Sequence, residues 1–304
     1  MDFAGKRLWF YLLSLSVIVP GVIFLILFWL KPGIDFTGGS EMKLRFADDV
    51  KQSDLRVELA GRGHPDARVQ IADDLYLIHT KELTEGEKGE LVEALKDALS
   101  PNGIEDLAFD FVSPVVASET VTAAMWAVLA AVVGIFFYVW WAFRNVPSPF
   151  RYGTAAIVAL AHDALIVMGI FAILGQVADI EVNTMFLIAL LTVIGYSVND
   201  TIVVFDRVRE NVQIYPNREL SDIVNISISE SLGRSLNTSL TLLFTLMAMI
   251  LFGGPTIRAF LLVLVIGVIS GTYSSIGIAS QLVVSWEEGD FGRLYRRLSP
   301  FGAR

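Results

Sequence analysis

The chain has 304 residues, of which 54% are hydrophobic and only 18% are charged. This balance is typical of an integral membrane protein and not of a soluble globule. The sequence contains no cysteine, which excludes disulfides, thiol catalysis and cysteine metal sites. Its histidines, His64, His79 and His162, are too far apart to predict a metal site, so we expect neither a metal nor a cofactor.

The net charge of −9 belongs to one segment of the chain. Residues 31–120 hold 19 acidic and 10 basic residues, a difference of −9, whereas the other 13 acidic and 13 basic residues cancel. An acidic segment of this kind repels phosphates, so no nucleic-acid partner is expected.

The first apolar run, 8–30, follows Lys6 and Arg7. Its 23 residues exceed the apolar core of about 7–15 residues in a signal peptide, and no convincing cleavage site follows it. We therefore predict an uncleaved first membrane span, with a kink at Pro20 and Gly21. Further apolar runs predict five more spans, at 121–143, 152–174, 182–205, 235–252 and 257–286.

In the short segments that flank these spans, lysine and arginine fall mostly on one side of the membrane. The segments before the first span, between spans two and three, between spans four and five, and after the sixth are all basic, whereas the short loops 176–181 and 253–256 hold no Lys or Arg. The positive-inside rule then predicts that both termini are cytoplasmic and that the acidic segment is periplasmic or extracellular. The expected organisation is a cytoplasmic N-terminus and first span at 1–30, an external domain at 31–120, spans two to six at 121–286, and a basic cytoplasmic tail at 287–304.

The external segment predicts a compact domain of strands and helices. Strands are expected at 40–46, 67–72, 75–80 and 107–112, and helices at 52–61 and 84–99. Ser53 is the candidate N-cap of the first helix, and Thr84 with Glu87 has the capping-box form for the second. The order βαββαβ predicts a small α+β ferredoxin-like domain beside an α-helical membrane bundle. It carries no nucleophile motif and no phosphate-binding loop, so we expect a domain that binds or is moved, and not an enzyme.

A carboxylate inside the fourth span is the most informative residue of the sequence. Asp200 follows Thr192 and Tyr196 on one helical face, with Asn199 beside it. A carboxylate at the centre of a membrane helix costs roughly 2.5–3.5 kcal/mol on insertion scales, so such residues face other helices or a water path. From the residues alone three interpretations stay open: a proton carrier, a static structural pair, or a charge at the water interface.

Arg234 is the natural partner of Asp200, because it opens the fifth span and lies, like Asp200, in the inner half of the membrane. It shares one helical face with Asn237, Thr238 and Thr241. Arginine stays protonated, so we expect it to hold Asp200 ionised when the two are close and to release it when helices shift.

The third span contains His162 and Asp163, which either extend the polar path or satisfy each other's neighbours within the bundle. The last span carries Gly267 and Gly271 in a GxxxG pattern with several serines, which predicts a packing face that another subunit could share.

A glycine-rich stretch, GIDFTGG at 33–39, follows the first span directly. It lacks the pattern of a phosphate-binding loop. We predict a turn that docks the external domain on the membrane, with Gly33, Asp35, Gly38 and Gly39 as its principal residues.

Together these motifs resemble the SecF family, the smaller membrane subunits of the bacterial SecD–SecF protein-translocation accessory complex. The matching motifs, in the family's order over essentially the whole chain, are GIDFTGG, the pair at 162–163, GYSVNDTIVVFDRVREN at 195–211 and RSLNTSLT at 234–241. The resemblance implies a member of the resistance-nodulation-division superfamily, in which two six-span halves form a working unit and SecD supplies the other half. It also implies that Asp200 and Arg234 are the proton-path residues and that SecD adds a further aspartate.

The expected function is therefore that of a subunit of the cytoplasmic (inner) membrane, in contact with lipid, that uses the proton motive force to promote late export of preproteins leaving the SecYEG channel. Protons are the coupling ion. Asn199, Asn237 and Thr238, with His162 and Asp163, are expected to support the polar path. The alternatives are a half-unit of a proton-driven small-molecule exporter and a structural subunit that stabilises a partner.

Overall fold

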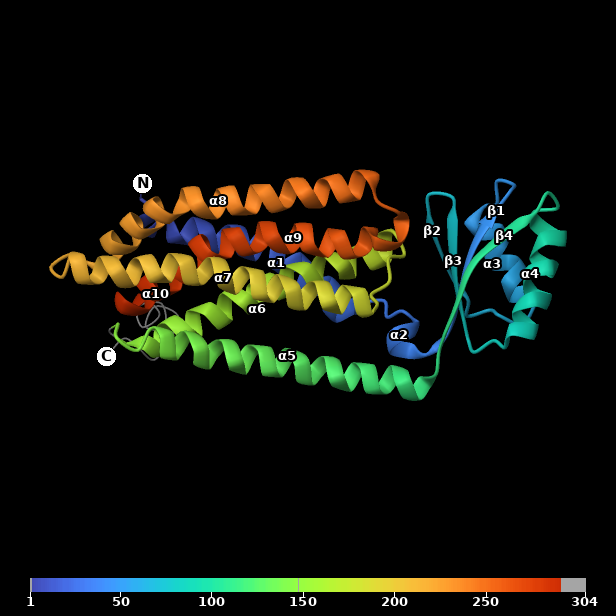
Figure 1. Ribbon diagram of the computed structural model, residues 1–304, viewed down its shortest axis with the longest axis horizontal. Helices are drawn as coiled ribbons and strands as arrows, with labels where there is room; N and C mark the ends of the chain where they lie inside the picture. The colour runs from blue at the N-terminus through green and yellow to red at the C-terminus, as the bar shows by residue number, and fades with distance from the viewer. Residues whose placement is uncertain (1, 147, 291–304) are drawn as a thin grey trace, which may run out of the picture.

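Long helices run side by side along the molecule, and a four-stranded sheet with two helices lies beyond one end of the bundle (Figure 1). The computed structural model describes residues 2–146 and 148–290, so the predicted basic tail from residue 291 onward lies outside the described residues. The bundle contains α1 (Arg7–Phe28, after a 3-10 turn at Ala4–Lys6), α5 (Pro114–Ala142), α6 (Pro149–Val177), α7 (Thr184–Ile214), α8 (Leu220–Phe252), and a last helix formed by α9 (Arg258–Ser274), the π-helical segment η3 (Ser275–Ala279) and α10 (Ser280–Glu287). The described residues contain six helices long and apolar enough to cross a membrane, as the sequence predicts.

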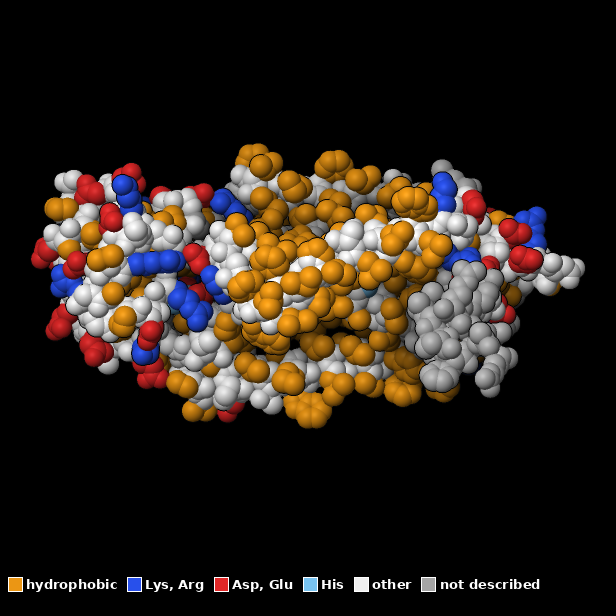
Figure 2. Space-filling view, turned by 180° about the vertical axis from the view of Figure 1, so that it is seen from behind, with side chains coloured by type: hydrophobic (Ala, Val, Ile, Leu, Met, Phe, Trp, Pro, Cys, Tyr) orange, Lys and Arg blue, Asp and Glu red, His pale blue; other side chains and the backbone are white. Residues whose placement is uncertain are grey.

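On the face that Figure 2 shows, hydrophobic side chains cover the middle of the bundle, whereas charged side chains gather on the sheet domain and at the opposite end of the molecule. An apolar outer surface suits contact with lipid, because hydrocarbon offers no hydrogen-bond partners to polar side chains. The start of α1 and the end of α10 lie at the end of the bundle away from the sheet (Figure 1).

Helices α7 and α8 extend well beyond the apolar runs that predicted them. The apolar run of the fourth span stops at Phe205, but α7 continues to Ile214, and α8 begins at Leu220, well before the predicted Ser235. Hydropathy detects only the segment that lipid surrounds, whereas a helix continues for as long as its backbone hydrogen bonds do. Arg234 is therefore in the middle of α8 and not at its start.

The domain beyond the bundle has the predicted ferredoxin-like topology. Its elements are β1 (Gly39–Phe46), α3 (Gln52–Gly61), β2 (Arg68–Ala72), β3 (Leu75–Thr80), α4 (Glu85–Leu99) and β4 (Ile104–Val112), after a short helix α2 (Ile34–Thr37). The strands are ordered β2-β3-β1-β4 and every neighbouring pair is antiparallel. Strands β1 and β2 therefore run in the same direction with β3 between them, which is the split βαβ arrangement.

Alternation along β1 decides which face of the sheet is buried. Met42, Leu44 and Phe46 point into a core shared with α3 and α4, whereas Glu41 and Lys43 point to the opposite face. The two helices cover the far face of the sheet, so its polar face is turned toward the bundle (Figure 1).

Capping explains how α4 begins, but not how α3 begins. The Thr84 hydroxyl accepts a hydrogen bond from the Glu87 backbone, and the Glu87 carboxylate accepts one from the Thr84 backbone, which confirms the predicted capping box. The prediction for Ser53 was wrong. Helix α3 begins at Gln52 as predicted, but its N-cap is Lys51, two residues before Ser53, and Lys51 makes no side-chain cap. The Ser53 hydroxyl instead donates to Asp54.

Glycines bring two pairs of helices into close contact. Helix α1 is continuous through Pro20, and Gly21 rests against Gly169 of α6, so that a Cβ at Gly169 would lie 2.7 Å from the Gly21 Cα. Gly267 faces Val193, and Gly271 faces Ser197 of α7. The predicted packing face of the last helix is therefore used within this chain.

We predict that Gly169→Ala destabilises the bundle, because the added methyl would meet the Gly21 backbone of α1, and a helix backbone cannot move aside cheaply. The expected loss is about 1–3 kcal/mol, measured as a lower melting temperature of the purified protein in detergent. Gly134→Ala is the matched control, because a Cβ at Gly134 of α5 meets nothing within 4 Å. Equal melting temperatures for the two variants would show that the α1–α6 contact is not tight.

Candidate functional site

Asp200 is buried in the bundle, with 7% of its surface exposed. The Ser275 hydroxyl, at the start of η3, donates a hydrogen bond of 2.7 Å to Asp200 Oδ2. A buried carboxylate needs donors, because an ionised group without them loses its hydration at a cost of several kcal/mol. The Asp200 carboxylate therefore lies inside the helix bundle and not on its outer surface.

Arg234 lies near Asp200 but is not ion-paired with it. The two residues line one cavity of about 180 Å³, and in the described part of the chain no ion pair joins them. Asn199 and Thr238, both predicted to support the polar path, line the same cavity. Arg234 and the Asp200 carboxylate thus lie on a shared polar cavity, and the Ser275 hydroxyl holds the carboxylate.

The cavity is polar enough to hold water. Its lining includes the Tyr196 side chain and Ser235, whose buried hydroxyl has no hydrogen-bond partner among the described residues. Buried polar groups are normally paired with protein or with ordered water, and a volume of 180 Å³ accommodates several waters at about 30 Å³ each. Arg234 also lines a second cavity of about 330 Å³ that continues along α7 and α8 toward the end away from the sheet.

One polar strip of the bundle surface adjoins this cavity. We call it the α7–α8 polar face, and its exposed residues are Asn199, Arg234, Asn237, Thr238 and Thr241. Asn237 lies on this face without lining the cavity. An arginine and two asparagines are costly against lipid, so a membrane protein covers such a strip with another protein surface or with water.

His162 and Asp163 form a second buried polar centre between α6, α7 and α9. His162 Nδ1 is 2.9 Å from Asp163 Oδ1, and its Nε2 is 2.9 Å from the Ser14 hydroxyl of α1. Three serine hydroxyls donate to the Asp163 carboxylate at 2.5–2.6 Å, from Ser197, Ser270 and Ser274. The carboxylate is thus fully satisfied, and it joins α6 to both α7 and α9.

The GIDFTGG stretch lies between the bundle and the sheet domain. Gly33 N donates to Val182 O at 2.8 Å, and Asp35 Oδ2 accepts from the Thr184 backbone N–H at 2.7 Å. Asp35 thereby satisfies one of the unpaired N–H groups at the N-terminus of α7, the helix that carries Asp200. Gly38 and Gly39 have φ of 75° and 121°, and a Cβ at Gly39 would lie 2.5 Å from Thr80 O, so both positions require glycine.

A histidine of the sheet domain reaches the loop that precedes α7. Both ring nitrogens of His79 contact carboxylates, Nε2 that of Glu41 on β1 and Nδ1 that of Glu181. Only the imidazolium can donate from both nitrogens. Burial opposes protonation, but hydrogen bonds and charge from Glu181 and Glu41 outweigh it and raise the pKa of His79 to about 9. The charged imidazole therefore joins the two domains at ordinary pH.

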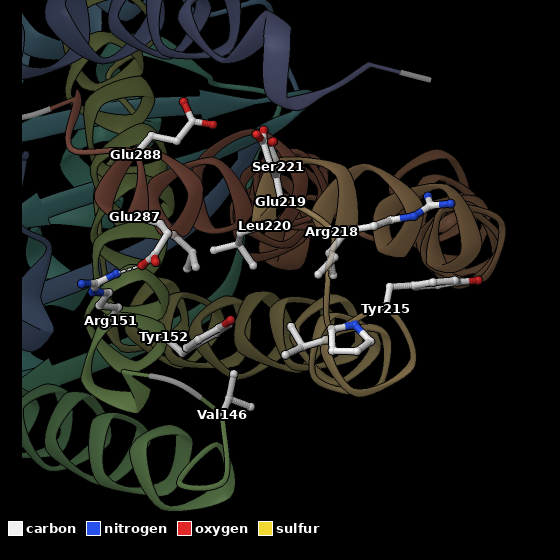
Figure 3. Close-up of a pocket in the computed structure, with 14 residues that line it drawn as sticks. Val146, Arg151, Tyr152, Tyr215, Arg218, Glu219, Leu220, Ser221, Glu287 and Glu288 are labelled. Carbon is white, nitrogen blue, oxygen red and sulfur yellow. Dashed lines mark hydrogen bonds and ion pairs between the residues drawn. The ribbon is translucent and has the colours of Figure 1, made fainter.

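A larger cavity, of about 660 Å³, lies at the end of the bundle away from the sheet (Figure 3). Arg151 and Glu287 form an ion pair on one side of it, and on the other the Arg218 guanidinium lies 4.8 Å from the centre of the Tyr215 ring. It contains none of the predicted site residues, which all lie elsewhere in the molecule.

Sequence reasoning missed the serines that hold the carboxylates. Ser270, Ser274 and Ser275 belong to the run interpreted as a packing face, and Ser14 lies in an otherwise apolar span. Serine in a membrane helix fits close packing as well as hydrogen bonding, so its type alone gives no signal. Nor does the sequence indicate that His79 would meet Glu181.

Comparison with known proteins gives consistent results over the whole chain. Residues 92–289 match the family described as protein export membrane protein SecD/SecF, C-terminal, and residues 23–50 match the SecD/SecF GG motif. The protein translocase subunit SecF of Thermobaculum terrenum is 45% identical over 316 residues, covering 100% of this chain and 99% of that protein. The SecF subunit of Anaerolinea thermophila is 38% identical, covering 98% of this chain and 97% of that protein.

Solved structures agree with the sequence relatives. A crystal structure of SecDF from Thermus, a translocon-associated membrane protein, is 33% identical with a TM-score of 0.85 and covers 95% of this chain. A crystal structure of SecDF in a super-membrane-facing form is 31% identical with a TM-score of 0.69 and covers 98%. The chain spans 39% and 40% of those longer chains.

We predict that the His79 contact makes the protein less stable as the pH becomes alkaline. A group whose pKa rises on folding, here from 6.5 to about 9, adds stability that is complete below pH 6.5 and is lost as pH rises through 9. The contribution is on the order of 3 kcal/mol. The melting temperature of wild type should therefore fall toward that of His79→Gln as pH rises to about 10.

His64→Gln provides the control, because His64 belongs to the same domain and takes part in no ion pair among residues 2–146 and 148–290. A constant difference in melting temperature between wild type and His79→Gln across this pH range would contradict the proposed charge on His79.

Proposed function

The chain belongs to the SecD/SecF family of protein-export membrane proteins, and from that premise we propose that it uses the proton motive force to promote late export of preproteins across the cytoplasmic membrane. Protons are the coupling ion, and Asp200 and Arg234 carry the proton path. Each proton supplies about 1.4 kcal/mol per tenfold gradient and roughly 2.3 kcal/mol per 100 mV of membrane potential.

The observation that carries this proposal is that Asp200 lies between two possible partners, the Ser275 hydroxyl and the Arg234 guanidinium. Its carboxylate is held by Ser275 on one side, and on the other it borders a cavity that contains Arg234 and the unpaired hydroxyl of Ser235. A carboxylate that can meet an arginine or a neutral hydroxyl changes its affinity for a proton with the arrangement of its helices. A static pair would show the two charges already in contact.

The α7–α8 polar face supports SecD as the partner. Arg234 and Asn237 are exposed there within membrane-spanning helices, and a second six-span half would cover them and complete the polar path. The relatives with solved structures are SecDF chains, of which this chain spans about two fifths. We propose that lipid contacts the remaining apolar surface, and that the assembled complex acts beside the SecYEG channel.

In this proposal a movement at the proton site reaches the external domain through α7. Asp35 in the GIDFTGG turn holds the N-terminus of α7, and Glu181 just before that helix contacts His79 in the sheet. A shift of α7 would therefore reach the sheet domain through rigid contacts at its first turn. In this proposal both termini are cytoplasmic, and the segment 31–120 is periplasmic, where it meets the emerging preprotein.

Two other functions are weaker candidates. A small-molecule exporter of the same superfamily needs a ligand pocket in its external part, whereas the cavity between the sheet and the bundle is lined by charged residues, among them Glu41, Lys43, Asp110 and Glu181. A purely structural subunit has no use for a carboxylate bordering a polar cavity, because apolar packing stabilises helix contacts at lower cost.

We predict that Asp200→Asn lowers proton-driven export at least about tenfold, because the amide cannot exchange a proton, while assembly with SecD remains intact. The rate is measured in vesicles that contain the complete complex and the Sec channel, with and without an imposed proton gradient. Asp222→Asn, which removes an exposed carboxylate from the first turn of α8, should export like wild type.

Wild-type export that proceeds equally with and without the gradient would contradict proton coupling. An assembled Asp200→Asn complex that exports at the wild-type rate would favour the structural subunit instead.

A further inference from the structure

Two adjacent serines on the last membrane helix contact two different buried carboxylates. The Ser274 hydroxyl donates to Asp163 Oδ2 at 2.6 Å, and the Ser275 hydroxyl donates to Asp200 Oδ2 at 2.7 Å. Successive residues of a helix point about 100° apart, so one turn can reach α6 with one side chain and α7 with the next. Both serines are completely buried. This turn is the place where the two polar centres of the bundle meet.

The backbone at this point is not an ordinary α-helix. Ser275–Ala279 is π-helical, with the Ser280 N–H bonded to Ser275 O five residues back. The Ser280 hydroxyl also donates to Ser275 O at 2.7 Å, and the Gln281 side chain donates to Ile276 O at 3.0 Å. Side chains thus satisfy carbonyls that the wider turn leaves poorly paired. Single π-helical turns inside α-helices are rare and occur frequently at functional sites.

The Ser275 contact and Arg234 lie on different sides of Asp200. Ser275 belongs to the last helix, whereas Arg234 belongs to α8 and faces Asp200 across the cavity that Tyr196 also lines. In the structure the hydroxyl holds Asp200 Oδ2, and no ion pair joins the carboxylate to Arg234 among the described residues. A carboxylate turned toward the guanidinium would be a second arrangement.

We propose that Ser275 is a positioning residue for the proton site: its hydroxyl holds Asp200 away from Arg234 in one state, and the π-helical turn lets it withdraw in the other. This inference rests on the proposed proton-coupling function. Ser274 directly precedes Ser275 in the chain. Withdrawal of Ser275 would therefore also move the Ser274 hydroxyl, which donates to Asp163. The turn thereby couples Asp200 to the His162–Asp163 centre, and through the His162–Ser14 contact to α1.

The test compares Ser275→Ala with wild type in the assembled complex. Without the hydroxyl the Asp200 carboxylate is free to turn toward Arg234, and a neighbouring guanidinium favours the ionised form of a carboxylate more strongly than a neutral hydroxyl does, so the protonated fraction falls. Dicyclohexylcarbodiimide reacts with protonated carboxyls inside membranes, and mass spectrometry of the peptide that contains Asp200 measures its labelling. We expect labelling to fall about three- to tenfold at a fixed neutral pH, with a fall in proton-driven export.

Ser285→Ala is the matched control. Ser285 is buried on the same helix and bonds to Tyr11 at 3.1 Å, away from both carboxylates, so its loss should change neither labelling nor export. Wild-type or raised labelling in Ser275→Ala overturns the proposal whatever happens to export, and so does lowered labelling with unchanged export. The export rate of Asp200→Asn tests the proton-coupling function. The labelling of Asp200 in Ser275→Ala tests the role of Ser275, and it is a separate measurement.

Discussion

The cost of placing carboxylates inside an apolar helix bundle governs how this protein is built. Asp163 and Asp200 are both buried, and each is held by hydroxyl groups contributed by the last membrane helix. Hydrogen bonds to neutral hydroxyls offset the loss of hydration without fixing the charge as an ion pair would. The glycine contacts of that helix with α7 bring the serines close enough to do this. Close helix packing and the hydrogen bonds to the carboxylates therefore depend on the same face of the last membrane helix.

Mechanical connection to the sheet domain follows from the same helix, α7. Its first turn is held by Asp35, and the loop before it carries Glu181, which contacts the charged His79. Asp200 lies further along this helix, beside the cavity that Arg234 lines. A change at the carboxylate and a change at the sheet domain are thus separated by one stiff element and two short polar contacts. Such contacts transmit a displacement only if each has two discrete arrangements, and the proposed exchange of Asp200 between Ser275 and Arg234 would be one such pair.

The sequence was most informative where a residue type was out of place. Asp200, Arg234, His162 and Asp163 were found because ionisable groups are rare in apolar runs, and the sheet topology followed from alternation and from the capping box at Thr84. Helix ends were harder, since hydropathy marks the lipid-facing length and not where α7 and α8 stop. Ser275 and the His79–Glu181 contact could not be predicted, because a membrane serine suits several roles and long-range pairing leaves no local pattern.

The central claim is that Asp200 takes up and releases a proton within the bundle. Infrared difference spectroscopy of the purified complex, titrated from alkaline to acidic pH, reports protonated carboxyl groups by their C=O stretching band. We expect wild type to gain a band from a carboxyl in an apolar environment, and Asp200→Asn to lack that band while Asp222→Asn retains it. An identical band in Asp200→Asn would show that another group carries the proton and would contradict this account.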